Sequence, residues 1–359
     1  MQHVKISDKL SSFNQIESSL SQTSAFPEIR YMGSKRRLLP WIFEILGKVD
    51  FETAIDPFSG SGAVSYLLKA MNKQVASSDF LNLSNTITAA LVENNTKIVE
   101  KKHLRTILRK VENQSHFIED NFEGVFFKNE DLKFLDRVSH NLLNFEDKHI
   151  GALIKSALIR SCAKRQPRGV FTISGDLSKY DDGRRDLRLS VEEHFFEQIE
   201  TFNASVFNNW KNNVSAHSDA FCVDPKNFDL VYLDPPYVPR SDDNCYVKRY
   251  HFLEGLSCYW QGLEIDYSTK VRKIPKKYTP FSYRRTAIDA FNRLFCHFKN
   301  QKIALSYSSN GYPDLEKLIE LLEKYKKNIT VHKKDHRYHF GTHSNAKRTK
   351  VEEYLIIGQ

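Results

Sequence analysis

The chain has 359 residues, of which 40% are hydrophobic and 27% are charged, a composition typical of a globular protein with one or two domains. No run of about eighteen apolar residues occurs, which excludes a transmembrane helix, and the polar N-terminus indicates no secretory signal. The 53 basic residues exceed the 44 acidic ones, and the net charge of +9 favours a polyanionic partner such as nucleic acid.

The first part of the chain predicts a polar arm followed by one helix. Residues 1–26 are rich in polar side chains, and we expect them to form a flexible arm. A basic segment at residues 30–37 leads into residues 38–46, where apolar side chains recur at helical spacing and Gly47 supplies a stop.

The next segments alternate between strand and helix. Residues 53–58 predict a short buried strand, and residues 59–62 predict a tight glycine turn. A helix is expected at residues 63–71, followed by a second strand at residues 74–79 that ends in a carboxylate. This order is one half of a doubly wound α/β sheet.

A long helical region then interrupts the α/β pattern. Residues 91–214 are predicted to be mainly helical, and their clearest helix spans residues 150–159, ahead of a basic loop at residues 164–172. A strong buried strand returns only at residues 228–234, and an aromatic, basic stretch follows it to about residue 298.

The last part of the chain returns to strand and helix. Two further strands are expected at residues 302–306 and 354–357, on either side of a helix at residues 314–325. The sequence therefore predicts an α/β fold, with a doubly wound, Rossmann-like core interrupted by a mainly helical inserted domain.

The cysteines and histidines give no sign of a metal site. The five cysteines are odd in number and contain no C-x-x-C pair, which disfavours a disulfide framework or a zinc site and favours a reducing cytoplasm. Four histidines crowd into residues 332–343, but Gly341 opposes a helix there and the surrounding lysines and arginines would repel a cation. A basic loop or hairpin is the preferred interpretation, and no metal is expected.

The glycine turn is the first candidate binding site. Gly60 and Gly62 allow a positive φ and a close approach of a ligand to the backbone, although the same residues occur in plain tight turns. The turn lacks the lysine of a P-loop and the third glycine of a dinucleotide fingerprint. Asp79, at the end of the next strand, is placed to accept both hydroxyls of a ribose. A nucleoside-bearing cofactor without a pyrophosphate is therefore favoured.

The second candidate site is Asp234-Pro235-Pro236-Tyr237. Two consecutive prolines make the chain rigid as it leaves the strand, so the carboxylate and the aromatic ring are held at the edge of the sheet. A fixed acceptor beside a flat stacking surface suits a planar ring that bears an amino group. The alternative is a prolyl turn with a solvent-facing aspartate.

With these motifs in this order, the chain resembles the Dam-like, alpha-group adenine-specific DNA methyltransferases. Six segments carry the resemblance, besides Asp79: residues 30–35 (Arg-Tyr-Met-Gly-Ser-Lys), 56–62 (Asp-Pro-Phe-Ser-Gly-Ser-Gly), 218–221 (Ser-Asp-Ala-Phe), 234–237 (Asp-Pro-Pro-Tyr), and the closing motifs at 306–310 and 352–355. Two features depart from the pattern. Tyr31 stands where members often have tryptophan, and the segment after Tyr237 is longer and more basic than in the smallest members.

The resemblance implies S-adenosyl-L-methionine as methyl donor and the exocyclic amine of a flipped adenine in double-stranded DNA as acceptor. It implies a catalytic core from residues 27–90 and 215–359, with residues 91–214 as an inserted target-recognition domain. The implied catalytic residues are Asp234, Pro235, Pro236 and Tyr237. The implied cofactor-binding residues are Tyr31, Met32, Lys35, Asp56, Phe58, Gly60, Gly62, Asp79, Asp219, Ala220 and Asp234.

Two basic clusters are candidates for contact with DNA, although a charge run is often only a solvated surface. The first comprises Lys164, Arg165, Arg168, Arg184, Arg185 and Arg188. The second comprises Lys270, Arg272, Lys273, Lys276, Lys277, Arg284 and Arg285, with Tyr278, Phe281 and Tyr283 interleaved.

The expected role is the modification enzyme of a restriction-modification system in a bacterial or viral-host cytoplasm, with a cognate endonuclease as a further partner. A cytosine-amine methyltransferase, an RNA adenine methyltransferase and a catalytically idle nucleic-acid-binding subunit are the alternatives. Asp234 favours adenine over cytosine, because the cytosine enzymes tend to carry serine there. The recognised bases and the oligomeric state stay open.

Overall fold

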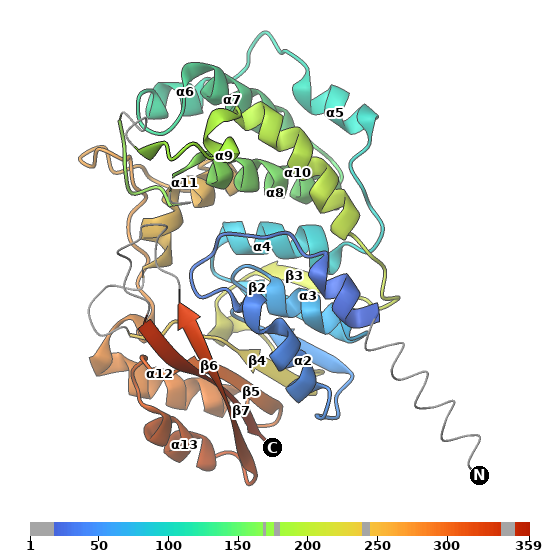
Figure 1. The fold of residues 1–359 in the computed structure, drawn as a ribbon, viewed down its shortest axis with the longest axis vertical. Coiled ribbons are helices and arrows are strands. Elements are labelled where there is room, and N and C mark those ends of the chain that lie inside the picture. Colours follow the sequence, from blue (N-terminus) through green and yellow to red (C-terminus); the bar gives the residue numbers. More distant parts are fainter. Residues whose placement is uncertain (1–17, 168–169, 176–179, 239–244, 339–348) are drawn as a thin grey trace.

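The computed structural model describes residues 18–167, 170–175, 180–238, 245–338 and 349–359. Within these residues one seven-stranded sheet runs in the order β3-β2-β1-β4-β5-β7-β6 (Figure 1). Its strands are β1 (Thr53–Asp56), β2 (Gln74–Asp79), β3 (Val214–His217), β4 (Leu230–Leu233), β5 (Lys302–Ser308), β6 (Ile329–Tyr338) and β7 (Thr349–Gly358).

The order in which the chain adds strands to the sheet changes direction at β1. This strand pairs in parallel with both β2 and β4, so the chain proceeds outward to β3 on one side and to β5 on the other. Only β7 is antiparallel to its two neighbours, β5 and β6. The expected doubly wound, Rossmann-like sheet is confirmed, and ligands bind at the carboxyl edge of such a reversal point.

Helices bury both faces of the sheet. Successive side chains of a strand point to opposite faces, so Tyr232 belongs to one hydrophobic cluster and Leu233 to the other. The first cluster includes α2 (Leu39–Leu46) and α3 (Ala63–Ala70), and the second includes α12 (Arg284–His297) and α13 (Leu315–Glu323).

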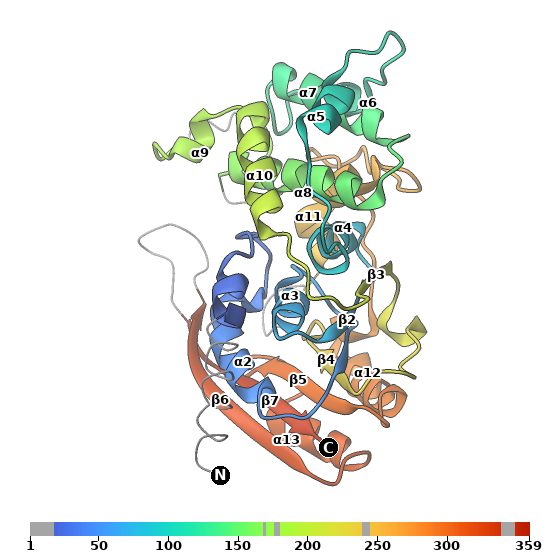
Figure 2. The same cartoon turned by 90° about the vertical axis from the view of Figure 1, so that its right-hand side faces the viewer.

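The predicted helical insertion is present as a separate layer above the sheet in both views (Figures 1 and 2). After α4 (Asn82–Thr88) and a π-helical turn (Ala89–Glu93), its helices are α5 (Lys101–Leu108), α6 (Phe117–Phe122), α7 (Asn129–Leu142), α8 (Lys148–Arg165), α9 (Arg185–Arg188) and α10 (Val191–Ser205). The helix expected at residues 150–159 is the centre of α8.

One helix from the later half of the chain also belongs to this layer. The ring of Phe252 on α11 (Tyr246–Cys258) lies 5.0 Å from both Phe122 and Phe171. The sequence division placed residues 215–359 in the core. The structure differs for α11, because its aromatic side chains complete the core of the insertion.

The N-terminal arm also differs from its expectation where the structure describes it. Residues 18–24 are helical, the Gln22 side chain donates to the Tyr66 hydroxyl at 2.8 Å, and the Phe26 ring lies 5.0 Å from Tyr66. These contacts pack residues 18–26 against α3, whereas residues 1–17 lie outside the described residues.

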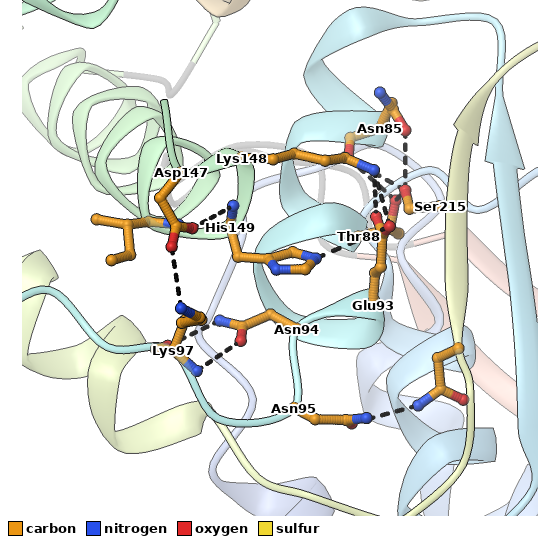
Figure 3. Close-up of polar contacts among 12 residues, drawn as sticks. Asn85, Thr88, Glu93, Asn94, Asn95, Lys97, Asp147, Lys148, His149 and Ser215 are labelled. Atoms are coloured by element: carbon orange, nitrogen blue, oxygen red, sulfur yellow. Dashed lines mark hydrogen bonds and ion pairs between the residues drawn. The ribbon is translucent and has the colours of Figure 1, made fainter. Parts of the chain in front are cut away.

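Polar contacts connect the chain segments that lie at the boundary between the core and the insertion (Figure 3). Lys148 at the start of α8 donates to both carboxylate oxygens of Glu93, at 2.8 and 2.7 Å. Lys97 pairs with Asp147 at 3.2 Å, and the hydroxyls of Thr88 and Ser215 are 2.6 Å apart. The last contact joins α4 directly to β3.

Among the described residues, strands β3 and β6 and helices α4, α11 and α12 were not predicted. Strand β3 is short and mostly exposed, and β6 is an edge strand rich in lysine and histidine, so neither has a buried apolar run. Helices α11 and α12 lie in the stretch that we expected only to be aromatic and basic. The histidine-rich segment begins on β6, which forms the expected hairpin with β7, and residues 339–348 lie outside the described part. No helix in the described residues is long and apolar enough to cross a membrane.

Candidate active site at the carboxyl edge of the sheet

Four aspartates lie at the carboxyl ends of neighbouring parallel strands. Asp56 ends β1 and Asp79 ends β2, while Asp219 follows β3 and Asp234 follows β4. Because parallel strands end at the same edge, residues far apart in the chain meet here.

The glycine turn between β1 and α3 has the conformation expected from its sequence. Gly60 and Gly62 have φ values of +50° and +78°, a region in which side chains are strained. The Gly62 N–H donates to the Ser59 carbonyl at 2.7 Å. A Cβ on Gly60 would lie 3.0 Å from the Tyr31 ring, so the turn leaves only bare backbone beneath that ring.

Asp56 is a buried carboxylate that stabilises the connection from this turn to α3. Its carboxylate accepts from the Ser65 hydroxyl of α3 at 2.6 Å, and the side chain is 1% exposed. Burial raises the pKa of Asp56 to about 7, which the bond from Ser65 partly opposes. The side chain therefore holds the turn rather than facing open solvent.

Asp79 connects the turn to the second strand. One carboxylate oxygen accepts from the Gly60 N–H and the other from the Leu81 N–H, both at 2.9 Å. Burial raises the pKa of Asp79 to about 6, and these two bonds oppose the rise. Each oxygen retains a lone pair, so the carboxylate can still accept hydroxyl donors.

The N-terminal segment joins the glycine turn to Asp234. The hydroxyls of Ser34 and Ser61 are 3.1 Å apart, and the ammonium of Lys35 lies 3.0 Å from the Asp234 carboxylate. Lys35 is 4% exposed. Burial raises the pKa of Asp234, and Lys35 opposes this by favouring the charged form. Adjacent residues thus contact the turn and Asp234, which brings the two predicted sites together.

Tyrosines from α11 complete this region, and sequence reasoning missed them. The Tyr31 ring stacks between Tyr246 and Tyr250, with centroids 5.4 and 5.2 Å away. The Met32 N–H donates to the Tyr250 hydroxyl at 2.6 Å. Tyr246 and Tyr250 are four residues apart, the spacing that places two side chains on one face of a helix. That spacing was the available signal.

Tyr237 is half-buried and lies just after the carboxyl end of β4, where the chain leaves the sheet. Its ring meets Tyr307 of β5 edge-on, with centroids 5.2 Å apart. Tyr307 belongs to the closing motif at residues 306–310 and is buried. Pro235 is buried and Pro236 is half-buried, so the Asp-Pro-Pro-Tyr segment is anchored on both sides.

The segment that begins at Ser218 lies beside Asp79. The Ser218 N–H donates to the Asp79 carbonyl at 3.0 Å, and Asp219 caps the next turn by accepting from the Phe221 N–H. Ala220 is buried.

Aromatic rings pack against Phe221, the last residue of this segment. The Phe281 ring lies edge-on to Phe58 at 5.6 Å and parallel to Phe221 at 6.1 Å. Phe281 is interleaved with the second basic cluster in the sequence, but its side chain is only 2% exposed. The ring is buried because it packs against Phe58, Phe221 and helix α12.

The first basic cluster is largely neutralised by acidic neighbours. Lys164 pairs with Asp186 at 2.9 Å, Arg184 pairs with Asp182 at 2.7 Å, and Arg185 pairs with Glu197. Arg165 is half-buried, Arg188 lies near Gly183, and Arg168 lies outside the described residues.

The second basic cluster lies against aromatic rings instead. Arg284 covers Tyr312 at 4.6 Å, and Arg285 covers Tyr283 at 5.6 Å. Tyr278 and Tyr283 are 63% and 41% exposed, with ring centroids 5.7 Å apart. Further members cover Phe80 and Tyr267, namely Lys277 and Arg272. Lys270 and Lys276 are exposed, whereas Lys273 is half-buried. Tyr278 and Tyr283 thus add a surface on which bases could stack.

Comparison with known proteins agrees with this arrangement. A family model described as D12 class N6 adenine-specific DNA methyltransferase matches residues 31–261, from the tyrosine above the glycine turn to the end of α11. The Type II methyltransferase M2.HphI of Haemophilus parahaemolyticus is 29% identical over 340 residues, which cover 91% of this chain and 96% of that protein. The modification methylase LlaI of Lactococcus lactis subsp. lactis is 22% identical, over 91% of this chain but only 54% of that protein.

Proposed function

This chain belongs to the D12 class N6 adenine-specific DNA methyltransferase family, and we propose that it methylates a flipped adenine within a specific double-stranded DNA sequence. The observation that carries the proposal is the pair of contacts from Ser34 to Ser61 and from Lys35 to Asp234. They bring the glycine turn and the Asp-Pro-Pro-Tyr segment to one site. Both the order of the motifs and this site suit the Dam-like alpha group.

The residues at this edge fit S-adenosyl-L-methionine. Gly60 offers backbone that a Cβ would obstruct, and the buried Asp79 has spare acceptor capacity for ribose hydroxyls. Asp219 would contact the adenine edge, beside Ala220, Phe58 and the unpredicted Phe281. Tyr31, Met32 and Lys35 would hold the methionine end, whereas Asp56 and Gly62 would act by shaping the turn. When bound, the cofactor supplies an electrophilic methyl group on a sulfonium.

Asp234 and Pro235 would activate the target amine. That amine is a poor nucleophile, because its lone pair is delocalised into the purine ring. The Asp234 carboxylate would accept one N–H and the Pro235 carbonyl the other, which favours a pyramidal nitrogen and stabilises its developing positive charge. Lys35 keeps Asp234 ionised and therefore able to accept.

The adenine must leave the duplex to reach Asp234, at a cost of a few kcal/mol. Stacking on Tyr237, worth about 1–3 kcal/mol, would offset much of that cost. Pro236 would keep the ring in position, because it makes the chain between Asp234 and Tyr237 rigid.

DNA would lie against the two basic clusters, with residues 91–214 contributing target recognition and residues 27–90 and 215–359 the catalytic core. Helix α11 would contribute to both parts. The second cluster is the stronger candidate, since the first is largely paired with carboxylates. Two relatives are named as a Type II methyltransferase and a modification methylase, so we extend the proposal to a restriction-modification system with a cognate endonuclease.

Mapping methylated adenines tests this function. Genomic DNA from cells that express the chain should carry N6-methyladenine at every copy of one short sequence, detected by single-molecule sequencing. DNA from cells with the Asp234→Ala variant should carry none. Modified cytosine would support the cytosine alternative. No modified base, together with DNA binding, would support an idle binding subunit.

A further inference from the structure

A group of cations lies between the N-terminal segment and the insertion, beside the proposed active site. We propose that Arg30, Arg160 and Lys164 bind one backbone phosphate of the DNA, and that Asp186 occupies the position of this phosphate in the free protein. The inference rests on the proposed function. Neither Arg30 nor Arg160 was expected from the sequence to contact DNA.

Asp186 already holds two of the three cations with a single carboxylate. One of its oxygens lies 2.9 Å from the Lys164 ammonium, and the other lies 3.6 Å from a terminal nitrogen of Arg30. The three side chains are 16% to 31% exposed, so the group faces solvent on one side. A carboxylate that bridges two cations shows that the pocket accepts an anion.

Arg160 adds donors that Asp186 does not satisfy. It precedes Lys164 by four residues on α8, which places both side chains on one face of the helix. Its Nε and Nη1 atoms are buried and have no hydrogen-bond partner in the part of the chain that the structure describes. Burial, together with the neighbouring Arg30, lowers the pKa of Arg160 to about 10. Unsatisfied buried donors are costly, so an added anion would stabilise this arrangement.

The charges around Arg160 leave an excess of positive charge. The groups that affect its pKa are Glu28, Asp186, Arg30 and Arg36, and Lys164 pairs with the same Asp186. Among these groups the cations outnumber the carboxylates. A phosphate is the matching ligand, because its oxygens can accept both the forked donors of arginine and a lysine ammonium.

The position of these three cations explains why the bound phosphate would be one from the DNA backbone. Arg30, Tyr31 and Arg160 line one small cavity between the N-terminal segment and α8. Tyr31 covers the glycine turn, and Lys35 contacts Asp234. An adenine that reaches Asp234 therefore brings its flanking backbone close to Arg30 and Arg160.

Asp186 would release the two cations through its side chain alone. The carbonyl of Asp186 lies 2.9 Å from Nε2 of the buried His194 on α10, which fixes the backbone of α9. Rotation of the Asp186 carboxylate toward solvent would release Arg30 and Lys164.

The salt dependence of DNA binding tests the site. Duplex affinity is measured by fluorescence anisotropy at several salt concentrations, for a site-containing duplex and a scrambled one. Arg160→Gln should weaken both equally and reduce the slope of log K against log salt by about 0.9, the value for one lost phosphate contact. Arg30→Gln, at a more exposed position, should act in the same way, and Arg160→Lys should restore most of the slope.

Two further variants complete the design. Lys148→Gln removes the same charge from the other end of α8 and should leave the slope unchanged. Asp186→Asn should tighten binding severalfold, because the competing carboxylate is lost. Unchanged slopes for Arg160→Gln and Arg30→Gln, or weaker binding by Asp186→Asn, would overturn the phosphate site. If the wild-type chain methylates DNA in that case, the proposed function survives without the site. A wild-type chain that neither binds nor methylates DNA would overturn both.

Discussion

At the scale of single residues, Asp234 combines burial with an ion pair. Desolvation raises its pKa, and Lys35 opposes this rise by favouring the charged form, so the ion pair supports a carboxylate acceptor in a partly water-excluded site. Few positions combine these properties, and those that do are often functional.

We therefore expect Asp234→Ala to lower the rate of methyl transfer at least a hundredfold, because the main acceptor for the developing positive charge is removed. Cofactor affinity should change little, since Gly60, Asp79 and Asp219 lie elsewhere on the edge. Single-turnover transfer from labelled cofactor and equilibrium binding measure the two effects. A loss of cofactor affinity at an unchanged rate would show that the role of Asp234 is misassigned.

Asp56 gives a prediction about pH. Its pKa is raised to about 7 in the folded protein, so the folded state binds the proton more tightly than the unfolded state does. The stability from this group is complete below about pH 4, the ordinary pKa of aspartate, and is lost as the pH rises through about 7.

The melting temperature of the cofactor-free wild type should therefore fall, relative to that of Asp56→Asn, as the pH rises from 5 to 8. Differential scanning calorimetry of both proteins across this range provides the measurement, and Asp79 contributes equally to each. Parallel curves would mean that Asp56 is not buried as a neutral acid.

At the scale of secondary-structure elements, α11 connects the insertion with the active site. Its Glu254 is buried and accepts from the N–H groups of Asn82 and Leu83 and from the Asn82 side chain, each at 2.9 Å. This carboxylate fixes the start of α4 just after Asp79. The same helix supplies the tyrosines that hold Tyr31.

Glu254→Ala should lower the free energy of unfolding by about 2–3 kcal/mol, because buried N–H groups lose a charged acceptor. Cofactor affinity should fall as well, since the tyrosines on α11 shift. Urea denaturation and cofactor titration measure these effects. Glu320→Ala, which removes an exposed partner of Lys317, is the control and should change stability by less than about 1 kcal/mol. Equal effects of the two substitutions would contradict the role given to α11.

At the scale of the whole molecule, the two basic clusters differ in how far neighbouring carboxylates neutralise their positive charge. Much of the first basic cluster is neutralised within the insertion, whereas the guanidinium groups of Arg284 and Arg285 lie over exposed tyrosines and Tyr312. DNA affinity should therefore depend more on the second cluster.

The double substitution Arg284→Gln and Arg285→Gln should reduce the salt slope of DNA binding by up to about 1.8, the value for two lost phosphate contacts. Arg184→Gln and Arg185→Gln together should change it much less. Anisotropy titrations at several salt concentrations compare the two pairs. A larger effect of the second pair would reverse the assignment of the clusters.

Local sequence was enough to predict the α/β class, strands β1, β2, β4, β5 and β7, the glycine turn and the two motifs at the edge of the sheet. Those features depend on short-range chemistry: apolar runs that must be buried, glycines that accept positive φ, and prolines that end a strand. The edge strands β3 and β6 were missed, because neither contains a run of buried apolar residues that the sequence pattern could reveal.

Only the tertiary structure decided which distant residues meet. The pairing of Lys35 with Asp234, the stacking of Tyr31 between two tyrosines of α11, and the inward position of Phe281 all join segments that are remote along the chain. The same holds for Arg160, whose neighbours Arg30 and Asp186 come from separate elements. Charge and ring contacts of this kind depend on how helices pack over the sheet. A local spacing, such as that of Tyr246 and Tyr250, shows which side chains share a helix face but not what that face packs against.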